Sequence, residues 1–268
     1  MKLKVRLGVL GVGNMGGAII DGLLAKKMLT AKQILVFDKL TDKARAFSRQ
    51  RKVTCSKSVD EIVAGSDVLL LAFKPQDLQE SAAIIQKSIS SKKIIISILA
   101  GTPIQKLKKY LGSKVDIVRA MPNLGAKVGA SVTALSGGTK QSLQIAEQIF
   151  SACGEAVRLE EKHFDLVTAI SGSGPAYFFY LMELLVSKAQ EHGIPEAQAK
   201  KLAVQTALGA AKLAAQSQDA PAQLREQVTS KGGTTAAALQ VLWNNQFGKV
   251  FHQALEAARQ RGQELSQS

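Results

Sequence analysis

The sequence predicts an α/β protein in which a doubly wound parallel sheet is followed by an all-helical domain. Up to about residue 160, short runs of β-branched residues alternate with polar stretches long enough to form a crossover helix. A glycine-rich turn follows the first of these runs, and strand-like runs disappear after about His163. A repeating order of strand and helix is typical of a parallel sheet with helices on both faces.

The predicted strands are short, continuously apolar and bounded by Gly, Asp or Pro, as strands buried on both faces are. Five of them lie in the first 120 residues, and two more flank a predicted helix. The five are Val5–Leu10, Gln33–Phe37, Val68–Ala72, Ile94–Ile98 and Val115–Arg119; the later two are Ser131–Leu135 and Ala156–Leu159, around a helix at Gln141–Ser151.

The rest of the chain is expected to be helical, giving two domains at residues 1–162 and 163–268. Apolar residues there recur at intervals of three and four, as in Phe178, Leu181, Leu184 and Leu185. So many apolar faces exceed what one copy of a short domain can cover, which predicts a homodimer or a multiple of dimers. Helix breaks are expected at Ser171–Pro175, His192–Pro195, Ser217–Pro221, Lys231–Gly233 and Gln246–Gly248.

The composition is that of a compact globular chain, with 46% hydrophobic and 21% charged residues among 268. Apolar runs such as Val68–Phe73 are far shorter than the roughly 18 residues that cross a bilayer, and Gly8 and Gly11 interrupt the stretch behind the basic N-terminus. We expect a cytoplasmic protein with no membrane segment. Cys55 and Cys153 have no ligand-like spacing, so no metal site is predicted.

The net charge of +14 lies mainly in the N-terminal part, where residues 1–165 hold 26 Lys and Arg against 14 Asp and Glu. These cations are dispersed over many elements, without a run of five like charges and without interleaved aromatic residues. Nucleic-acid-binding proteins concentrate positive charge on one face or along one helix. We therefore expect a solvated basic surface rather than a nucleic-acid partner.

A dinucleotide-binding loop follows the first predicted strand. Gly11, Gly13 and Gly16 have the G-x-G-x-x-G spacing where a helix begins, which is the Rossmann context. Gly11 permits the tight turn, Gly13 lets the backbone approach a pyrophosphate, and Gly16 lets the helix pack closely on the strand. The phosphates are then expected on the unpaired N–H groups at the helix start, around Asn14 and Met15.

The choice of nicotinamide cofactor depends on the residues after the second strand. Asp38 stands where an acid binds the ribose 2′-OH of NAD. Lys39 and Lys43 follow at once and offer partners to a 2′-phosphate. The sequence favours NADP(H), with NAD(H) as the alternative.

Further cofactor contacts are expected at the carboxyl ends of later strands, where open α/β sheets bind their ligands. Pro75 has the plainer interpretation of a helix start, and Asn123 either orients the nicotinamide end or caps a turn. The expected residues are Ala72, Lys74 and Pro75, then Ile98, Leu99 and Ala100, and finally Asn123.

Six ordered segments give the chain a resemblance to pyrroline-5-carboxylate reductases over essentially its whole length. The two C-terminal segments are the most diagnostic, because other Rossmann reductases share only the loop and parts of the N-terminal domain. The segments are Gly11–Gly16, Ala72–Pro75, Ser97–Gly101, Arg119–Asn123, Ser171–Tyr177 and Thr229–Thr235.

The resemblance implies reduction of 1-pyrroline-5-carboxylate, a cyclic imine carboxylate, to L-proline with NAD(P)H. It implies a helical domain for substrate binding and dimerisation, in which a loop holds the substrate carboxylate and Thr235 hydrogen-bonds the ring nitrogen. Both segments also have simpler structural explanations. The hydroxyl residues of Thr229–Thr235 could cap a helix, and the small residues of Ser171–Pro175 could permit a tight helix junction at a dimer interface. The implied substrate residues are Ser230, Gly233, Thr234 and Thr235, with Thr168 and Ser171 on the opposite wall.

Three positions depart from the pattern of the family that the chain resembles. Lys231 stands where Pro is usual, Leu124-Gly125 where Thr-Pro is usual, and Phe73 where Val is usual. None of these changes removes a group that the chemistry requires, so we expect them to alter affinity rather than reaction type.

Two other functions stay open at the level of sequence. A reductase of a β-hydroxy acid or of another imine shares the N-terminal domain but is expected to lack the Gly232–Thr235 loop. A non-catalytic dinucleotide-binding or nucleic-acid-associated protein accounts for the basic charge and the altered loop. No residue pattern identifies a strong general acid.

Overall fold

The computed structural model describes residues 2–90 and 92–267, and the chain forms two compact units. The first comprises Met1–Ser173 with Ala258–Ser268, and the second comprises Gly174–Ala257. The units follow tertiary contacts, whereas the division expected at residues 162 and 163 follows the change from strands to helices. That division stays a prediction.

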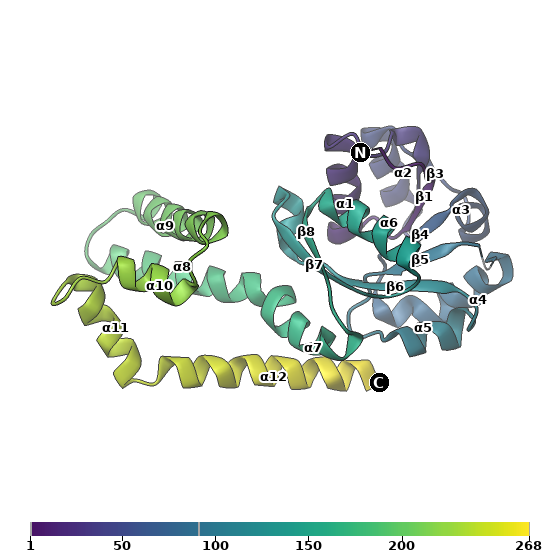
Figure 1. The fold of residues 1–268 in the computed structure, drawn as a ribbon. Coiled ribbons are helices and arrows are strands. Elements are labelled where there is room, and N and C mark those ends of the chain that lie inside the picture. The colour runs from purple at the N-terminus through teal and green to yellow at the C-terminus, as the bar shows by residue number, and fades with distance from the viewer. Residues whose placement is uncertain (1, 91, 268) are drawn as a thin grey trace. The chain divides into compact units, whose positions relative to one another are not determined.

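The first unit is built on an eight-stranded sheet with the order β3-β2-β1-β4-β5-β6-β7-β8 (Figure 1). All seven predicted strands are present, with ends shifted by a few residues, and the two-residue strand β3 was missed. The strands are β1 (Leu7–Leu10), β2 (Ile34–Phe37), β3 (Thr54–Cys55), β4 (Val68–Leu71), β5 (Ile94–Ser97), β6 (Asp116–Met121), β7 (Ser131–Gly137) and β8 (Gly154–Arg158).

The sheet is parallel, as predicted, except at one junction. Val9 of β1 pairs in register with Val36 of β2 and Leu70 of β4, whereas Ala120 of β6 lies opposite Leu135 in an antiparallel β7. Only the short 3-10 helix η3 (Leu124–Val128) separates these two strands. A parallel crossover needs about a dozen residues or more, so the chain turns back instead.

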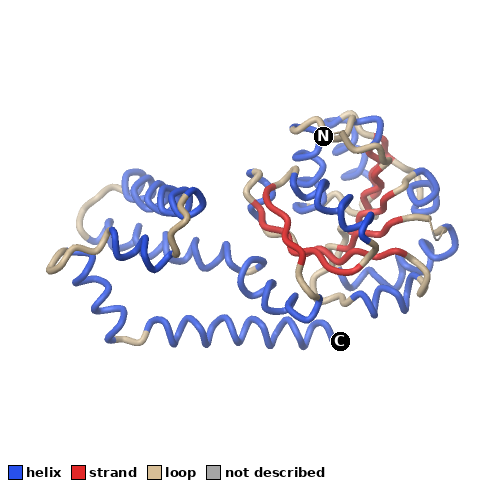
Figure 2. The backbone as a smooth tube through the Cα atoms, in the orientation of Figure 1, coloured by secondary structure: helices blue, strands red, loops and turns tan. Residues whose placement is uncertain are grey.

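Helices cover both faces of the sheet (Figure 2). Each face has its own core of buried side chains. Ile19 and Phe150 are fully buried in the core beneath α1 and α6, and Ile62, Ile85 and Leu107 are fully buried in the core on the other face. The helices of this unit include α1 (Asn14–Ala25), α2 (Thr41–Arg51), α3 (Val59–Gly65), α4 (Leu78–Ser88), α5 (Ile104–Leu111) and α6 (Lys140–Ser151), with short turns η1 (Ala31–Gln33), η2 (Pro75–Asp77) and η4 (Glu161–His163).

The C-terminal region is helical, as predicted, and all five expected breaks are confirmed. At Ser171–Pro175, a turn of π-helix, η5 (Thr168–Gly172), ends before a bend at Ser173, whose N–H donates to the Thr168 carbonyl at 2.8 Å, and the next helix begins at Gly174. The helices are α7 (Phe164–Val167), α8 (Gly174–Glu191), α9 (Glu196–Gln216), α10 (Pro221–Gln227), α11 (Thr234–Asn244) and α12 (Phe247–Gln267).

Within the described ranges, no helix combines the length and the apolar character that crossing a bilayer requires. The same residues contain no group of three or more His, Cys, Asp or Glu side chains placed to hold a metal ion. Cys55 is half-buried and Cys153 is buried, and both are free thiols.

Candidate active site

The glycine loop between β1 and α1 forms an open cradle. Gly11 has φ +101°, and a Cβ built there lies 2.5 Å from the Ala72 carbonyl oxygen; a Cβ on Gly16 lies 2.2 Å from the Gly11 oxygen. A Cβ on Gly13 meets no atom within 4 Å, and Gly13 precedes α1 without any side-chain cap. Because residue 13 has no side chain, there is open space beside the N–H groups of the first turn of α1. A pyrophosphate can occupy this space and accept hydrogen bonds from those N–H groups.

A cavity of about 500 Å³ opens beside this loop, at the carboxyl ends of β1, β2 and β4. Seven predicted cofactor residues line it together, which places them in one site. Pro75 is the first residue of the 3-10 helix η2, which agrees with its alternative interpretation as a helix start, and Lys74 immediately precedes it. The seven residues are Gly11, Gly13, Asn14, Asp38, Lys39, Ala72 and Lys74.

Four charged side chains of this cavity form two ion pairs, Lys39 with Asp77 and Lys43 with Asp38. The Asp38 carboxylate accepts from the N–H groups of Val12 and Leu40 at 3.0 and 3.1 Å and lies 3.1 Å from the Lys43 ammonium. Asp38 thereby braces the glycine loop from the end of β2. The Lys39 ammonium donates to Asp77 at 2.6 Å, and this hydrogen bond is the main cause of a raised pKa of Lys39.

A second cavity, of about 460 Å³, lies at the start of α1 and is lined by Gly13, Asn14, Arg51 and Lys127 among others. The Lys127 ammonium, on η3, donates to Asn14 Oδ1 at 3.0 Å. Lys127 thus brings a positive charge to the helix end that is expected to bind phosphates. Sequence reasoning missed it; the available signal was a lysine four residues after Asn123, on a short turn between two strands.

The predicted residues after β5 and β6 line neither cavity, and the structure limits what they can offer. The Leu99 side chain is buried in the core, so only its backbone is available. Asn123 Oδ1 accepts from the Gly125 N–H at 3.1 Å and caps η3, which matches the plainer interpretation. The Asn123 backbone N–H donates to Ser131 Oγ at 3.2 Å, whereas its side-chain nitrogen, Nδ2, donates to no residue in the described part of the chain. The unusual Gly125 supplies an N–H that a proline lacks.

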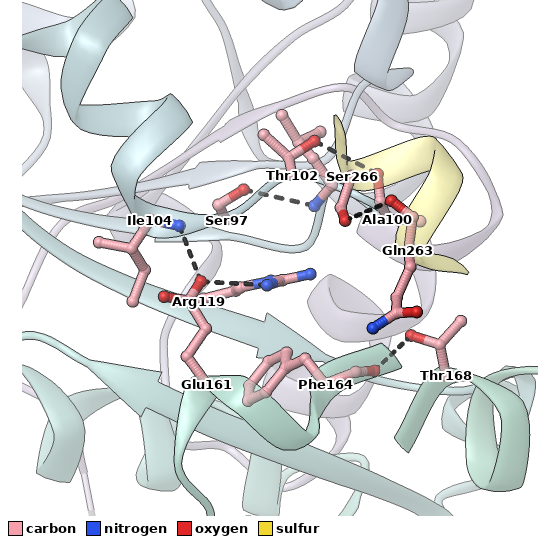
Figure 3. Close-up of polar contacts among 11 residues, drawn as sticks. Ser97, Ala100, Thr102, Ile104, Arg119, Glu161, Phe164, Thr168, Gln263 and Ser266 are labelled. Carbon is pink, nitrogen blue, oxygen red and sulfur yellow. Dashed lines mark hydrogen bonds and ion pairs between the residues drawn. The ribbon is translucent and has the colours of Figure 1, made fainter. Parts of the chain in front are cut away.

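A buried arginine of β6 was also missed (Figure 3). Arg119 is 6% exposed, its guanidinium lies 4.7 Å from the centre of the Phe164 ring, and its Nη1 lies 3.0 Å from Glu161 Oε1. The same carboxylate oxygen accepts from the Ile104 N–H at 2.7 Å, at the start of α5. The available signal was a cation directly after the apolar pair Ile117-Val118 of a strand predicted to be buried.

Thr168 and Ser171 lie in the π-helical turn of the first unit. Their hydroxyls donate to the carbonyls of Phe164 and Val167, at 2.8 and 3.0 Å. Figure 3 places Thr168 in the group around Arg119, together with Gln263 from the end of α12. With their protons engaged by the backbone, the two hydroxyls are available as acceptors.

The predicted carboxylate loop lies in the second unit, at the start of α11. Gly233 is the N-cap of that helix and provides no side-chain cap, and its N–H donates to the Ser230 carbonyl at 3.0 Å. The hydroxyls of Thr234 and Thr235 bond to no residue that the structure describes, and Thr235 is half-buried. An ordinary Ser or Thr cap is therefore absent here, and the loop presents free donors at a helix N-terminus.

Comparisons with known proteins agree over nearly the whole chain. Residues 161–265 match the family model described as pyrroline-5-carboxylate reductase dimerisation, and residues 6–101 match that of NADP oxidoreductase, coenzyme F420-dependent. Proteins named pyrroline-5-carboxylate reductase from Synechocystis sp. and Pseudomonas aeruginosa are 38% and 37% identical, covering 98% of this chain and 99% and 97% of their own lengths.

Solved structures give the same result. A pyrroline-5-carboxylate reductase from Coxiella burnetii superposes with a TM-score of 0.93 at 33% identity, covering 99% of this chain and 100% of the other. A pyrroline carboxylate reductase from Plasmodium falciparum with NADP bound gives 0.87 at 28% identity, with 99% and 100% covered. Sequence, fold and glycine loop together show that the chain belongs to the pyrroline-5-carboxylate reductase family.

Proposed function

We propose that this protein reduces 1-pyrroline-5-carboxylate to L-proline with NADPH, with NADH as the alternative cofactor. The observation that carries the proposal is the full-length similarity to named reductases of this substrate. The Gly232–Thr235 loop with its free hydroxyls favours this reaction over that of other Rossmann reductases. We also propose that the enzyme is cytoplasmic and works without a membrane or nucleic-acid partner.

The cofactor is assigned to the cavity beside the glycine loop. Its pyrophosphate fits the start of α1, where a Cβ on Gly13 would occupy the open space. The 2′-phosphate is assigned to Lys39 and Lys43, which line this cavity. The NADP bound by the Plasmodium falciparum relative supports NADP as the cofactor. The ends of β5 and β6, with Ala100 and Asn123, are proposed to border the nicotinamide, which supplies a hydride when bound.

The substrate carboxylate is assigned to the loop at the start of α11. Ser230, Gly233 and Thr234 offer hydroxyl and backbone donors there, and the positive end of the helix favours an anion. Thr235 is proposed to donate to the ring nitrogen, and Thr168 and Ser171 are proposed as further substrate-binding residues. Reduction of the C=N bond also consumes one proton, which comes from solvent and reaches nitrogen through a water held by Thr235 or through the Thr235 hydroxyl, which regains a proton from water as it gives one up.

The test is oxidation of NADPH in the presence of the cyclic imine, followed by absorbance, with proline identified as product. Thr235→Val keeps the side-chain shape but deletes the donor, so we expect kcat/KM to fall by about ten- to a hundredfold, or roughly 1–3 kcal/mol. Thr235→Ser retains the hydroxyl and is the matched control.

The affinity for NADPH, measured by titration, should be the same in all three proteins. Normal turnover by Thr235→Val would contradict the role of Thr235. Absence of turnover by the unaltered protein would contradict the proposed reaction.

A further inference from the structure

The cavity beside the glycine loop is spanned by an ion pair whose partners come from two strand ends. Lys39 follows β2, and Asp77 ends η2, which follows β4. Lys39 Nζ lies 2.6 Å from Asp77 Oδ1, and both residues line the cavity. The Asp77 side chain is 17% exposed and that of Lys39 is 68% exposed, so the carboxylate is the more buried partner and the lysine is open to a ligand from the solvent side.

The other acid of the cavity is committed elsewhere. Asp38 accepts from two backbone N–H groups and from the Lys43 ammonium. Both cations that follow β2 are therefore paired with carboxylates in this structure. A 2′-phosphate that approaches them enters a group of charges that is already neutralised.

We infer that Asp77 is a specificity-determining residue of the cofactor site, one that holds Lys39 and opposes the 2′-phosphate of NADPH. The inference rests on the proposed function, in which Lys39 meets that phosphate. A phosphate in contact with Lys39 lies within a few ångströms of the Asp77 carboxylate, because the pair itself is only 2.6 Å apart. NADH carries a neutral hydroxyl at this position, which a carboxylate does not repel and can accept a hydrogen bond from.

The electrostatics of Lys39 agree with this arrangement. Its pKa is raised by the hydrogen bond to Asp77 and, beyond that, by the charges of Asp77, Glu80 and Asp38. Lys39 thus remains an ammonium at neutral pH, surrounded by acids. Glu80 raises the pKa through charge alone, without a contact, which makes it a control for the general effect of nearby negative charge.

The plainer account is that Lys39–Asp77 is a surface ion pair of little consequence. Such pairs contribute little to stability, so folding measurements do not separate the two accounts. Cofactor discrimination does separate them, because only the proposed role makes NADPH and NADH respond differently.

The experiment is calorimetric titration of the full chain with NADPH and with NADH at one ionic strength. Asp77→Asn removes the charge and keeps the shape; we expect the Kd for NADPH to fall about three- to tenfold and that for NADH to stay within about twofold. Glu80→Gln removes one charge from the same segment without touching Lys39 and should shift neither Kd by more than about twofold. Adenosine 2′,5′-bisphosphate and 5′-AMP, titrated in parallel, isolate the contribution of the 2′-phosphate.

The inference is overturned if Asp77→Asn raises the Kd for NADPH, or if it changes the Kd values for NADPH and NADH by the same factor. It is also overturned if Glu80→Gln lowers the Kd for NADPH as much as Asp77→Asn does. NADH binding also reports that the variant is folded. An unaltered protein that binds neither cofactor refutes the proposed function instead, so the two failures are distinguishable.

Discussion

Three glycines in the loop after β1 are required for three different reasons. Gly11 has a positive φ and contacts the backbone at Ala72, and Gly16 contacts the Gly11 carbonyl, so both are needed by the fold itself. Gly13 has no atom near its missing side chain. Glycine is therefore required at position 13 for binding the ligand rather than for folding.

Gly13→Val should leave the protein folded but weaken NADPH binding at least about tenfold, because the side chain fills the phosphate cradle. Thermal unfolding and a cofactor titration measure the two effects. Gly16→Val is the contrasting variant: its Cβ has no room against the Gly11 oxygen, so it should lower the melting temperature strongly. Unchanged NADPH affinity in Gly13→Val would contradict the assignment of the cradle.

The buried thiol of Cys153 makes the free energy of unfolding depend on pH in the alkaline range. Burial between α1 and the start of β8 raises the pKa of its thiol to about 11, against about 9 for an unperturbed thiol. Because the thiol stays protonated to a higher pH in the folded state than in the unfolded state, its contribution to the free energy of unfolding is complete below pH 9. That contribution is lost as the pH rises through 11. Cys153→Ala should remove this loss, which amounts to at most about 2–3 kcal/mol.

Denaturant unfolding at several pH values from 7 to 11 measures the effect. Cys55→Ala, at a less buried thiol, is the matched control and should keep the wild-type slope. Parallel pH profiles for the wild type and Cys153→Ala would show that the thiol is not responsible.

At the scale of elements, strand existence could be predicted because buried parallel strands are continuous apolar runs. The reversal at β7 could not be read from such runs, because apolar character carries no direction; the evidence lay in the short connection through η3. Gly172, Gly174 and Pro175 correctly predicted the break before α8, but the π-helical turn that precedes it was missed, because nothing in the local sequence distinguishes it from an α-helical turn. Of the site, the glycine loop was predictable, whereas the pairing of Lys39 with Asp77 depends on strand order in space.

The Arg119–Glu161 pair ties three elements together: β6, the start of α5 and η4. Glu161→Gln should destabilise the fold by roughly 2–4 kcal/mol, because it leaves the buried Arg119 without a counter-charge and weakens the cap on α5. Chemical denaturation gives the free energy of unfolding. Glu160→Gln alters the adjacent exposed pair with Lys162 and should change stability by less than about 0.5 kcal/mol. Equal effects of the two substitutions would contradict this account.

At the scale of the whole molecule, the helices of the second unit expose an unusual amount of apolar surface. On α8, Phe178 is 63% exposed and Leu185 is 55% exposed, and Trp243 on α11 is 54% exposed. Large exposed apolar patches mark interaction sites. The match to a dimerisation family over residues 161–265 identifies the partner that we propose, a second copy of the chain.

The protein should therefore sediment as a dimer or a multiple of dimers at micromolar concentration. Leu185→Glu places a charge in the proposed interface and should raise the dissociation constant at least about tenfold. Val128→Glu makes the same kind of change at a residue of η3 that is 81% exposed and should leave the assembly intact. A stable monomer in the unaltered protein would refute the proposed assembly.

The end of α12 belongs to the first unit, where Leu265 packs against Gly101. During synthesis, residues 1–173 leave the ribosome before residues 174–257, yet the first unit is complete only when residues 258–268 have followed. Domains usually fold in order of synthesis. Both cores of the earlier unit come from residues before 157, whereas its last packing contact arrives only after the later unit has been translated, so a fragment ending at residue 173 lacks the packing that covers Gly101.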